Sequence, residues 1–421
     1  CALKGNYVHD ALYMFWLNSS LHRHERLPKK ELFALQDRLI KKQINIAYNH
    51  SRFYRRKFKE ANIKPNQIKG YSDLIKMPTT SRQEVIQNYS DFIIKDAPYG
   101  IRNTSGTTGE LLSIRFTKHQ YFLNHLLLGR FFRRLGATHG DCVLNIHNMN
   151  SPFKFFTQLR PYDAIYLRYD QIEEALATIK SHSINIILSS PHVLELLSDR
   201  ISFAKKRDFK FLISWGELVP ETRKKRIEKA FNCPMYDLYG LTEMPLVAAE
   251  CKKRNLHINS DVLSLEVVDD DKQVYGRRGK IVVTDLFNIW SPLIRYESGD
   301  MGALSSRTCA CGSEFPVLSN LEGMLNDIIL LKDGTKITPV QLMYAMYSIL
   351  DAKKYQIVQT AKQRVNVLVV CDPDKFFSIQ QRIKNTLRQI LIGFDIHIER
   401  TKDIPLIGGP GKSKFIISLD R

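Results

Sequence analysis

The chain has 421 residues, 44% of them hydrophobic, with 62 Lys and Arg against 43 Asp and Glu and a formal net charge of +19. This length allows two or three domains with full-sized cores, and the hydrophobic content is typical of a globular soluble protein. The longest apolar runs are short and interrupted by charge, which excludes a transmembrane span.

The excess of positive charge predicts an anionic partner. A nucleic-acid or anionic membrane surface would account for it, and so would a nucleotide, coenzyme A or an acidic carrier protein. No zinc-finger array, RNA-recognition sheet motif or heptad-linked basic region accompanies the charge, so we favour the acidic ligand over nucleic acid. The seven cysteines are odd in number and thinly spread, which argues for a reducing compartment and predicts a cytoplasmic protein.

The predicted elements begin with a basic segment of helical periodicity at 32–61. From 118 to 231, short apolar runs alternate with helical stretches, which predicts a parallel sheet with helices on its faces. The strands expected there are 142–146, 164–167, 184–188 and 210–213, and the helices are 118–134, 171–181, 191–205 and 220–231.

Strand-like runs without intervening helices follow, and they predict an antiparallel or barrel-like subdomain. These runs are 263–268, 279–283 and 293–296. A hairpin around 327–335, a helix from Pro339 and a further helix among three strands then predict a small α+β domain. That helix is expected at 376–392 and those strands at 355–359, 365–371 and 395–399.

We therefore expect an α/β protein with a large N-terminal domain, in which helices flank parallel sheets, and a small mobile C-terminal domain. The large domain would comprise a basic helical segment at 1–95 and a core at 96–322, with the β-rich subdomain at about 246–318. The small lid domain would occupy 323–421.

A hydroxyl-and-glycine loop, NTSGTTGE at 103–110, has the composition of a phosphate cradle. Glycines let backbone N–H groups close on an anion, and the hydroxyls add donors. No Lys-Ser/Thr pair follows the last glycine, so this is not the P-loop of kinases and ATPases. An ordinary Ser/Thr/Gly surface turn is the alternative.

Four further segments carry recognisable chemistry. They are YDLYGLTE at 236–243, RYESGD at 295–300, EGMLND at 322–327 and PLIGGPGKSK at 405–414. An aromatic residue at Tyr239 is suited to a purine ring, and the Glu243 carboxylate to a hard cation that bridges phosphates. Asp300 follows a glycine and is suited to accept ribose hydroxyls.

In order and spacing these five segments resemble the adenylate-forming superfamily of acyl-CoA synthetases. They are most similar to its phenylacetate–CoA ligase family, which includes capsule-cluster proteins. Each segment alone is weakly informative, whereas five in this order, over nearly the whole chain, are strongly informative.

The resemblance implies roles for individual residues. The β- and γ-phosphates of ATP would be held by Thr104, Ser105, Gly106, Thr107, Thr108 and Gly109. The adenine would be lined by Gly216, Glu217, Asp237, Tyr239 and Gly240. Thr242 would contact the α-phosphate, Glu243 would bind Mg²⁺, and Asp300 would grip the ribose. Lys412 would bridge the substrate carboxylate and the α-phosphate, where charge spreads in the transition state.

Structural alternatives exist for the central residues. Asp300 could cap a turn after Gly299, and Glu243 could be a charge at a helix N-terminus. Lys412 could be a solvated loop lysine, the commonest fate of this residue type.

Two departures from the family pattern stand out. The hinge box usually reads Gly-Arg-x-Asp, but here Met324 replaces the arginine and Asn326 replaces the aspartate, which puts efficiency in doubt. The segment after Ile146 is shorter than in aryl-CoA ligases, so the acyl pocket is expected to be remodelled and phenylacetate is not assumed. By resemblance His147 and Trp215 would line that pocket; a structural histidine and a core tryptophan are the alternatives.

A Cys-x5-His pair and a Cys-x-Cys pair flank the β-rich subdomain and supply four ligands, the inventory of a structural zinc site. The residues are Cys251, His257, Cys309 and Cys311. Similar placements occur in the family that the chain resembles. Reduced thiols beside a solvent histidine are the alternative.

We therefore predict an ATP-dependent ligase that activates a carboxylic acid as its acyl adenylate and transfers it to coenzyme A or to a carrier-protein phosphopantetheine. The alternatives are transfer of AMP to a small-molecule hydroxyl or amine, and a non-catalytic nucleotide- or nucleic-acid-binding protein. The sequence leaves the acid, the acceptor and the oligomeric state open, with a homodimer suggested by analogy alone.

Overall fold

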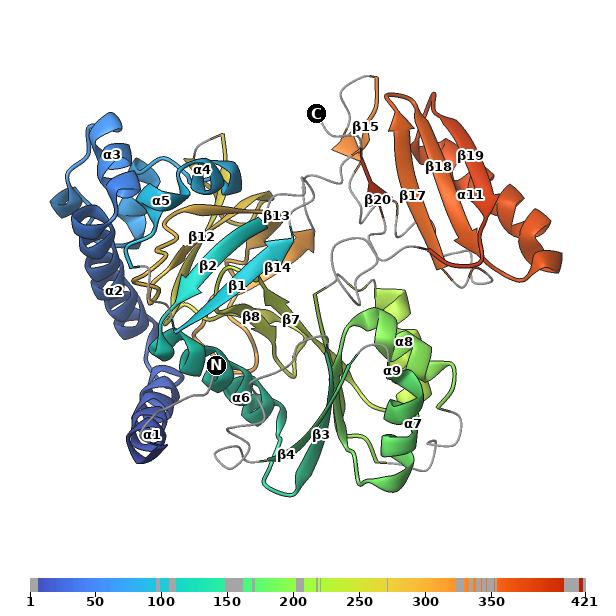
Figure 1. Ribbon diagram of the computed structural model, residues 1–421, viewed down its shortest axis with the longest axis horizontal. Coiled ribbons are helices and arrows are strands. Elements are labelled where there is room, and N and C mark those ends of the chain that lie inside the picture. The colour runs from blue at the N-terminus through green and yellow to red at the C-terminus, as the bar shows by residue number, and fades with distance from the viewer. Residues whose placement is uncertain are drawn as a thin grey trace. The chain divides into compact units, whose positions relative to one another are not determined.

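The computed structural model divides the chain into two compact units. The described residues are 7–95, 99–105, 111–147, 162–168, 171–201, 208–216, 219, 221–270, 272–322, 329–332, 336–337, 342, 346, 352, 354–404 and 416–418. The first unit comprises Cys1–Asp141, Ser151–Ala164 and Tyr236–Leu321, and the second comprises Cys142–Asn150, Ile165–Met235 and Glu322–Arg421. Figure 1 shows their helices and strands, coloured along the chain.

Helices open the first unit. They are α1 (Tyr7–His24), α2 (Lys29–His50), α3 (Arg52–Glu60), α4 (Arg82–Gln87) and α5 (Tyr89–Phe92), with 3-10 turns at Pro65–Gln67 and Tyr71–Lys76. The single helical segment predicted at 32–61 is in fact divided, because Ser51 adopts an extended backbone between α2 and α3. The Ser51 hydroxyl accepts a hydrogen bond from the backbone N–H of Tyr54, which stabilises the start of a new helix.

Two buried glutamines fix α2 against the strands of the first unit. The side-chain amide of Gln36 donates to the carbonyls of Ser260 and Leu263 at 3.0 Å each, and that of Gln43 donates to the carbonyl of Asn288 at 2.7 Å. Because these amides are buried, their hydrogen bonds specify the position of the helix as well as stabilising it.

Strands dominate the rest of the first unit. A two-stranded antiparallel sheet, β1 (Gly100–Ser105) and β2 (Leu111–Phe116), precedes helix α6 (Lys118–Leu135). The remaining strands lie in the order β11-β10-β12-β13-β14-β9-β8-β7. Their bounds are β7 (Met235–Gly240), β8 (Leu246–Glu250), β9 (Leu256–Ile258), β10 (Leu263–Asp269), β11 (Lys272–Gln273), β12 (Gly279–Asp285), β13 (Tyr296–Leu304) and β14 (Val317–Glu322).

The strand predicted at 293–296 begins only at Tyr296 and continues to Leu304. Arg295 has a φ of 47°, a left-handed conformation that no regular strand accepts. Its guanidinium is buried and pairs with Glu266 at 3.0 Å. The left-handed residue, whose backbone N–H donates to Thr284 Oγ1, thus stands immediately before β13.

The second unit contains a parallel sheet covered by helices. Its strands lie in the order β6-β5-β3-β4, with β5 parallel to both β3 and β6. The elements are β3 (Asp141–Ile146), β4 (Tyr162–Leu167), α7 (Ile172–Ser181), β5 (Ile186–Ser189), α8 (Pro191–Ser198), β6 (Phe211–Trp215) and α9 (Glu221–Phe231). The helix predicted at 191–205 thus ends at Ser198, and residues 202–207 lie outside the described part.

The C-terminal part of this unit has its own apolar core. Its elements are β15 (Ile329–Leu330), β16 (Lys336–Ile337), β17 (Lys354–Ala361), β18 (Arg364–Val370), a 3-10 turn at Pro373–Lys375, α11 (Phe376–Ile390), β19 (Asp395–Arg400) and β20 (Ile416–Ile417). The larger sheet has the order β19-β18-β17-β20. Of the helix predicted from Pro339, Leu342 and Met346 are described, and both are helical and buried.

The predicted α/β fold class is confirmed: a helix-flanked parallel sheet, a β-rich region and a small C-terminal α+β part are all present. Within the described residues, no helix combines the length and the apolar character needed to cross a membrane.

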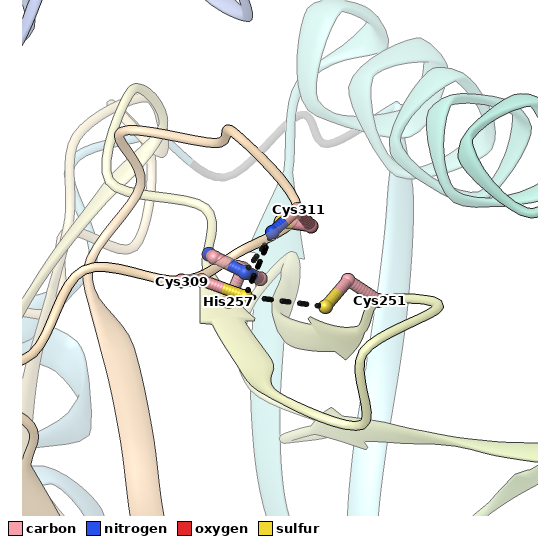
Figure 2. A group of neighbouring side chains, drawn as sticks. All are labelled: Cys251, His257, Cys309 and Cys311. Atoms are coloured by element: carbon pink, nitrogen blue, oxygen red, sulfur yellow. Dashed lines mark hydrogen bonds between the residues drawn. The ribbon is translucent and has the colours of Figure 1, made fainter.

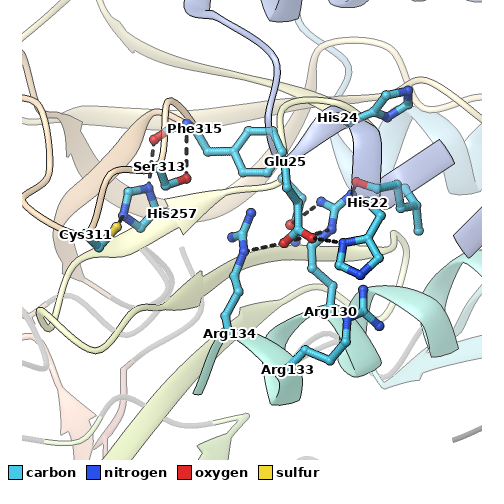
Figure 3. A network of polar contacts seen from close by, with 12 residues as sticks. His22, His24, Glu25, Arg130, Arg133, Arg134, His257, Cys311, Ser313 and Phe315 are labelled. Atoms are coloured by element: carbon cyan, nitrogen blue, oxygen red, sulfur yellow. Dashed lines mark hydrogen bonds and ion pairs between the residues drawn. The ribbon is translucent and has the colours of Figure 1, made fainter. Parts of the chain in front are cut away.

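A buried charge network fixes α1 to α6 and to the segment that joins β9 and β10. Arg130 of α6 donates to both carboxylate oxygens of Asp261, at 3.0 and 2.6 Å. His24, the last residue of α1, contacts the same carboxylate at 3.0 Å. Beside them, Arg134 pairs with Glu25 at 2.6 Å (Figure 3). A bidentate, fully buried pair of this kind strongly disfavours the loss of either partner.

Asp261→Asn should therefore destabilise the protein. Burial opposes ionisation of Asp261, but Arg130 and His24 more than offset it, so the pKa of Asp261 lies well below its ordinary value. The variant leaves the Arg130 charge buried and uncompensated, and we expect the free energy of unfolding at pH 7 to fall by about 3–5 kcal/mol. Urea denaturation measures this, with the exposed Asp269→Asn as a near-neutral control.

The Arg130–Asp261 pair also predicts how the loss of stability in Asp261→Asn depends on pH. A carboxylate with a lowered native pKa contributes stability above its unfolded pKa, about 4 for Asp, and loses that contribution as the pH falls below it. The difference in free energy of unfolding between Asp261→Asn and the parent should therefore become smaller in acid. A gap of the same size at neutral and strongly acidic pH would contradict this account.

Candidate active site

Tyr239 and Asp300 meet in the first unit although 61 residues separate them. Tyr239 lies near the end of β7, and its phenol donates to Asp300 Oδ2 at 2.7 Å; both side chains are buried. The backbone N–H of Asp300 donates to Ser298 Oγ at 3.1 Å, and the Ser298 hydroxyl donates to the Ile281 carbonyl at 3.0 Å. The Asp300 carboxylate is thereby fixed from both its side chain and its backbone.

A bulge presents Asp300. The β12–β13 ladder pairs Lys280 with Met301 and Val282 with Glu297, so three residues of β13 lie opposite one residue of β12. Gly299, at the centre of the bulge, has a φ of 83°, which a residue with a Cβ rarely adopts. Bulges of this kind redirect side chains beside functional sites. The bulge thus turns Asp300 toward Tyr239.

Glu243 is a second carboxylate held by cationic and phenolic partners. It follows β7 in a turn, and its Oε1 lies 3.2 Å from Nη1 of Arg82 and accepts from the Tyr296 phenol at 3.1 Å. Arg82 is the first residue of α4, and Tyr296 is the first of β13. The fold therefore already places a positive charge against this carboxylate.

The negative charge of Glu243 acts on the Asp300 carboxyl. Burial raises the pKa of Asp300 to about 6, a shift that the Tyr239 hydrogen bond opposes and the negative charge of Glu243 reinforces. Burial also raises the pKa of Tyr239 and of Tyr296. At pH 7 both phenols therefore remain donors, and Asp300 is an ionised acceptor whose charge is unfavourable in the free protein.

The other predicted nucleotide residues lie partly in the described structure. Asp237 is within β7, where its backbone N–H donates to the Glu250 carboxylate at 2.8 Å. Gly240 ends β7 and Thr242 lies in the following turn, both exposed. Thr104 and Ser105 end β1. Outside the described residues lie Gly106, Thr107, Thr108, Gly109, Glu217, Met324, Asn326 and Lys412.

His147 and Trp215, the predicted pocket residues, contact each other in the second unit. His147 follows β3 and Trp215 ends β6, and their ring centroids are 4.2 Å apart. Both strands flank β5 in parallel, so both residues lie at the carboxyl ends of strands, where open α/β sheets bind ligands. Gly216 follows Trp215 with a φ of 85°.

Cys251, His257, Cys309 and Cys311 converge in the first unit (Figure 2). Their ligand atoms all lie within 4.8 Å of one another. Cys251 Sγ and Cys309 Sγ are 3.7 Å apart, and Cys311 Sγ lies 3.2 Å from His257 Nε2. Two sulfurs bonded to one tetrahedral zinc are about 3.8 Å apart, whereas a disulfide is about 2.05 Å long. The sulfur spacing therefore matches a metal site and excludes a disulfide.

The surroundings of this cluster fit the same chemistry. His257 Nδ1 lies 2.8 Å from the Phe315 carbonyl, which can only accept, so Nδ1 carries the proton and Nε2 is left as a ligand (Figure 3). Burial lowers the pKa of His257, which favours the neutral imidazole. The side-chain amide of Asn255 and the backbone N–H of Lys253 donate to the sulfurs of Cys309 and Cys251, each at 3.3 Å.

Sequence reasoning missed the partners of Glu243. Arg82 lies 161 residues from it, and no spacing in the sequence connects the two. The capping box formed by Ser81 and Glu84 could have located the start of α4 and hence Arg82. Tyr296 stands inside the 295–300 motif, in which Asp300 is the more obvious ligand.

A scan against family models matches residues 71–285 to the model described as AMP-binding enzyme. The chain belongs to the AMP-binding enzyme family. The predicted resemblance to the adenylate-forming superfamily is thereby confirmed.

Two curated relatives of this AMP-binding enzyme extend over most of its length. A phenylacetate-coenzyme A ligase of Thermus thermophilus is 24% identical and covers 79% of this chain and 79% of its own. Protein CapK of Staphylococcus aureus is 22% identical and covers 94% and 92%. Among solved structures, a 2-hydroxyisobutyryl-CoA ligase in the postadenylation state has a TM-score of 0.79, at 19% identity, covering 95% and 91%. This likeness supports the fold.

Asp300→Asn should stabilise the protein at neutral pH. Because the native pKa of Asp300 is about 6 and the unfolded value is near 4, the carboxyl disfavours the folded state above that interval. Asparagine cannot ionise, so we expect the variant to gain roughly 1–3 kcal/mol at pH 7 and nothing at pH 4. Denaturation at pH 7 and at pH 4 measures the free energy of unfolding of the variant and the parent, with Asp269→Asn as control. A loss of stability at pH 7 would show that Asp300 serves the fold.

Proposed function

We propose that this AMP-binding enzyme activates a carboxylic acid as its acyl adenylate, releases pyrophosphate, and transfers the acyl group to the thiol of coenzyme A. Asp300 supports this function most directly. It is a buried carboxylate with a raised pKa, it accepts a hydrogen bond from the Tyr239 phenol near the end of β7, and a bulge at Gly299 presents it. A ribose brings two hydroxyl donors, which would stabilise the charge that burial disfavours.

Tyr239 and Glu243 have complementary tasks in this proposal. The Tyr239 phenol donates to Asp300, and in this proposal the ring of Tyr239 lies against the adenine. Glu243 offers carboxylate oxygens, the ligands that Mg²⁺ prefers when it also binds substrate phosphates. When bound, that ion would neutralise phosphate charge. Arg82 adds a fixed positive charge on the same side.

Lys412 would act during adenylation. Two anions, a carboxylate and the α-phosphate, must approach each other, and a lysine on a glycine-rich loop supplies a compact positive charge there. Thr242 and the glycine loop at 104–109 would contact the phosphates. Rotation about the 322–327 segment would then replace this lysine by the thiol acceptor.

The net charge of the chain and the names of its relatives both bear on the identity of the thiol acceptor and of the acid. Coenzyme A is favoured because the curated relatives include several phenylacetate–CoA ligases and because the net charge of +19 suits an anionic cofactor. An acidic carrier protein would suit the same charge. The named acids of the relatives, phenylacetate and 2-hydroxyisobutyrate, differ in kind, so a screen must include aromatic and aliphatic acids.

ATP–pyrophosphate exchange tests the proposal. We expect exchange that depends on one class of acid, and a thioester as the product when coenzyme A is added. Lys412→Ala should lower the exchange rate by about a hundredfold or more, because the lost charge acts in the transition state. Lys414→Ala, two residues away in the same loop, should retain exchange. Equal rates for both variants, or an AMP adduct as the stable product, would overturn the proposal.

We also propose that Cys251, His257, Cys309 and Cys311 hold a structural zinc ion. The spacing of the sulfurs, the orientation of His257 and the closed set of four ligands are those of a structural site, which leaves no position for substrate. The ion would clamp the β8–β9 hairpin to the segment before β14. The six described cysteines are free thiols, and we propose a reducing compartment, the cytoplasm, for this protein.

Metal analysis of the purified protein tests the zinc site. We expect about one zinc per chain, lost in Cys309→Ser and accompanied by a lower thermal unfolding midpoint, because metal binding is linked to folding. Cys233→Ser changes a buried cysteine outside the cluster and should keep its zinc. Parent protein that contains clearly less than one zinc per chain, after growth with added zinc, would rule the site out.

A further inference from the structure

Helix α1 presents an unusual outer face. Leu12, Phe15 and Trp16 are 65%, 72% and 56% exposed. Positions 12, 16, 19 and 23 recur at intervals of three and four, so they lie along one stripe of the helix. Ser19 and Arg23 continue this stripe, and Phe15 lies beside it. The stripe is therefore apolar and aromatic at one end, basic at the other, and contains no acidic residue.

The opposite face of α1 is firmly attached to the first unit. Met14, Leu17 and Leu21 are buried in its apolar core. Tyr13 hydrogen-bonds His119 on α6, and Asp10 forms an ion pair with Lys118. The charge network of Figure 3 holds the other end. The helix is thus fixed in place, and the exposed face is displayed by a well-packed element.

Positive charge predominates in the N-terminal helical segment and gathers at one end of the exposed face. Between residues 7 and 60 there are twelve Lys and Arg against five Asp and Glu. At the end of α1, in the turn beyond it and at the start of α2, exposed basic residues follow one another: Arg23, Arg26, Lys29 and Lys30. Of the three acidic residues nearby, Asp10 and Glu25 are paired with Lys118 and Arg134, and Glu31 is exposed in the first turn of α2.

We propose that the Leu12–Phe15–Trp16 face of α1 binds the surface of an anionic phospholipid membrane. Helices that lie in the membrane interface combine Trp, Phe and Leu on one face with flanking Lys and Arg. The aromatic rings enter the headgroup region, while the basic side chains attract anionic lipid. A second copy of the chain is a poorer occupant, because it would bring two strongly basic segments face to face.

Binding of this kind is peripheral and does not depend on the chemistry of the site. The helix lies on the surface by one face, while its other face remains packed against α6. Failure of the proposed ligase activity would leave the inference standing, and failure of membrane binding would leave the ligase proposal standing. The two are tested separately.

Cosedimentation with lipid vesicles tests the inference on the full chain. The parent should bind vesicles of phosphatidylglycerol mixed with phosphatidylcholine, bind phosphatidylcholine alone far less, and be released at high salt. Replacing Leu12, Phe15 and Trp16 by Ser should weaken binding about tenfold or more, because apolar insertion and charge attraction act together. Phe377→Ser with Ile392→Ser is the control, since these side chains are 72% and 68% exposed on another part of the chain.

Unfolding midpoints and particle sizes complete the experiment. The triple variant should unfold at nearly the same temperature as the parent, because its replaced side chains are exposed. Three results would overturn the inference: no binding of the parent to anionic vesicles, equal binding by parent and triple variant, or a parent dimer that the triple variant dissociates. The last result would assign the face to a second copy of the chain.

Discussion

Two carboxylates share a poorly hydrated region of the first unit, and this juxtaposition constrains everything around them. The negative charge of Glu243 disfavours ionisation of the buried Asp300. Two phenols and a guanidinium, from Tyr239, Tyr296 and Arg82, hold them in place. A protein without a ligand for this region would gain stability by removing one carboxylate. A magnesium nucleotide, which brings hydroxyl donors and a cation, would satisfy both.

The local backbone serves this arrangement. Arg295, which forms a buried pair with Glu266, has a left-handed conformation immediately before β13, and the Tyr296 phenol at the start of that strand donates to Glu243. Gly299 then allows the bulge that turns Asp300 toward Tyr239. Local strain beside a functional group is common, and well-packed surroundings sustain it. Here the surroundings are the closely packed β10, β12 and β13.

Periodicity and motif order predicted much of this molecule from sequence. The alternation of apolar runs and helices between residues 118 and 231 gave the parallel sheet, because each run is long enough to cross a buried layer once. The spacing of four cysteine and histidine residues indicated a shared site before any contact was known. Asp300 and Tyr239 were both named, although their hydrogen bond spans 61 residues.

The remainder depended on contacts that spacing does not encode. The break at Ser51 arises because a hydroxyl caps a new helix in the middle of a periodic segment. The Arg82–Glu243 pair and the Arg130–Asp261 pair join residues more than a hundred positions apart. Helix α1 was not predicted, so neither was its exposed face, which lies opposite the buried Met14, Leu17 and Leu21.

A crystal structure of the protein with AMP tests the central claim most directly. The account predicts that both ribose hydroxyls lie within hydrogen-bond distance of the Asp300 carboxylate and that the adenine lies beside Tyr239. Crystals that hold the nucleotide elsewhere, with the Tyr239–Asp300 pair untouched by it, would contradict the account.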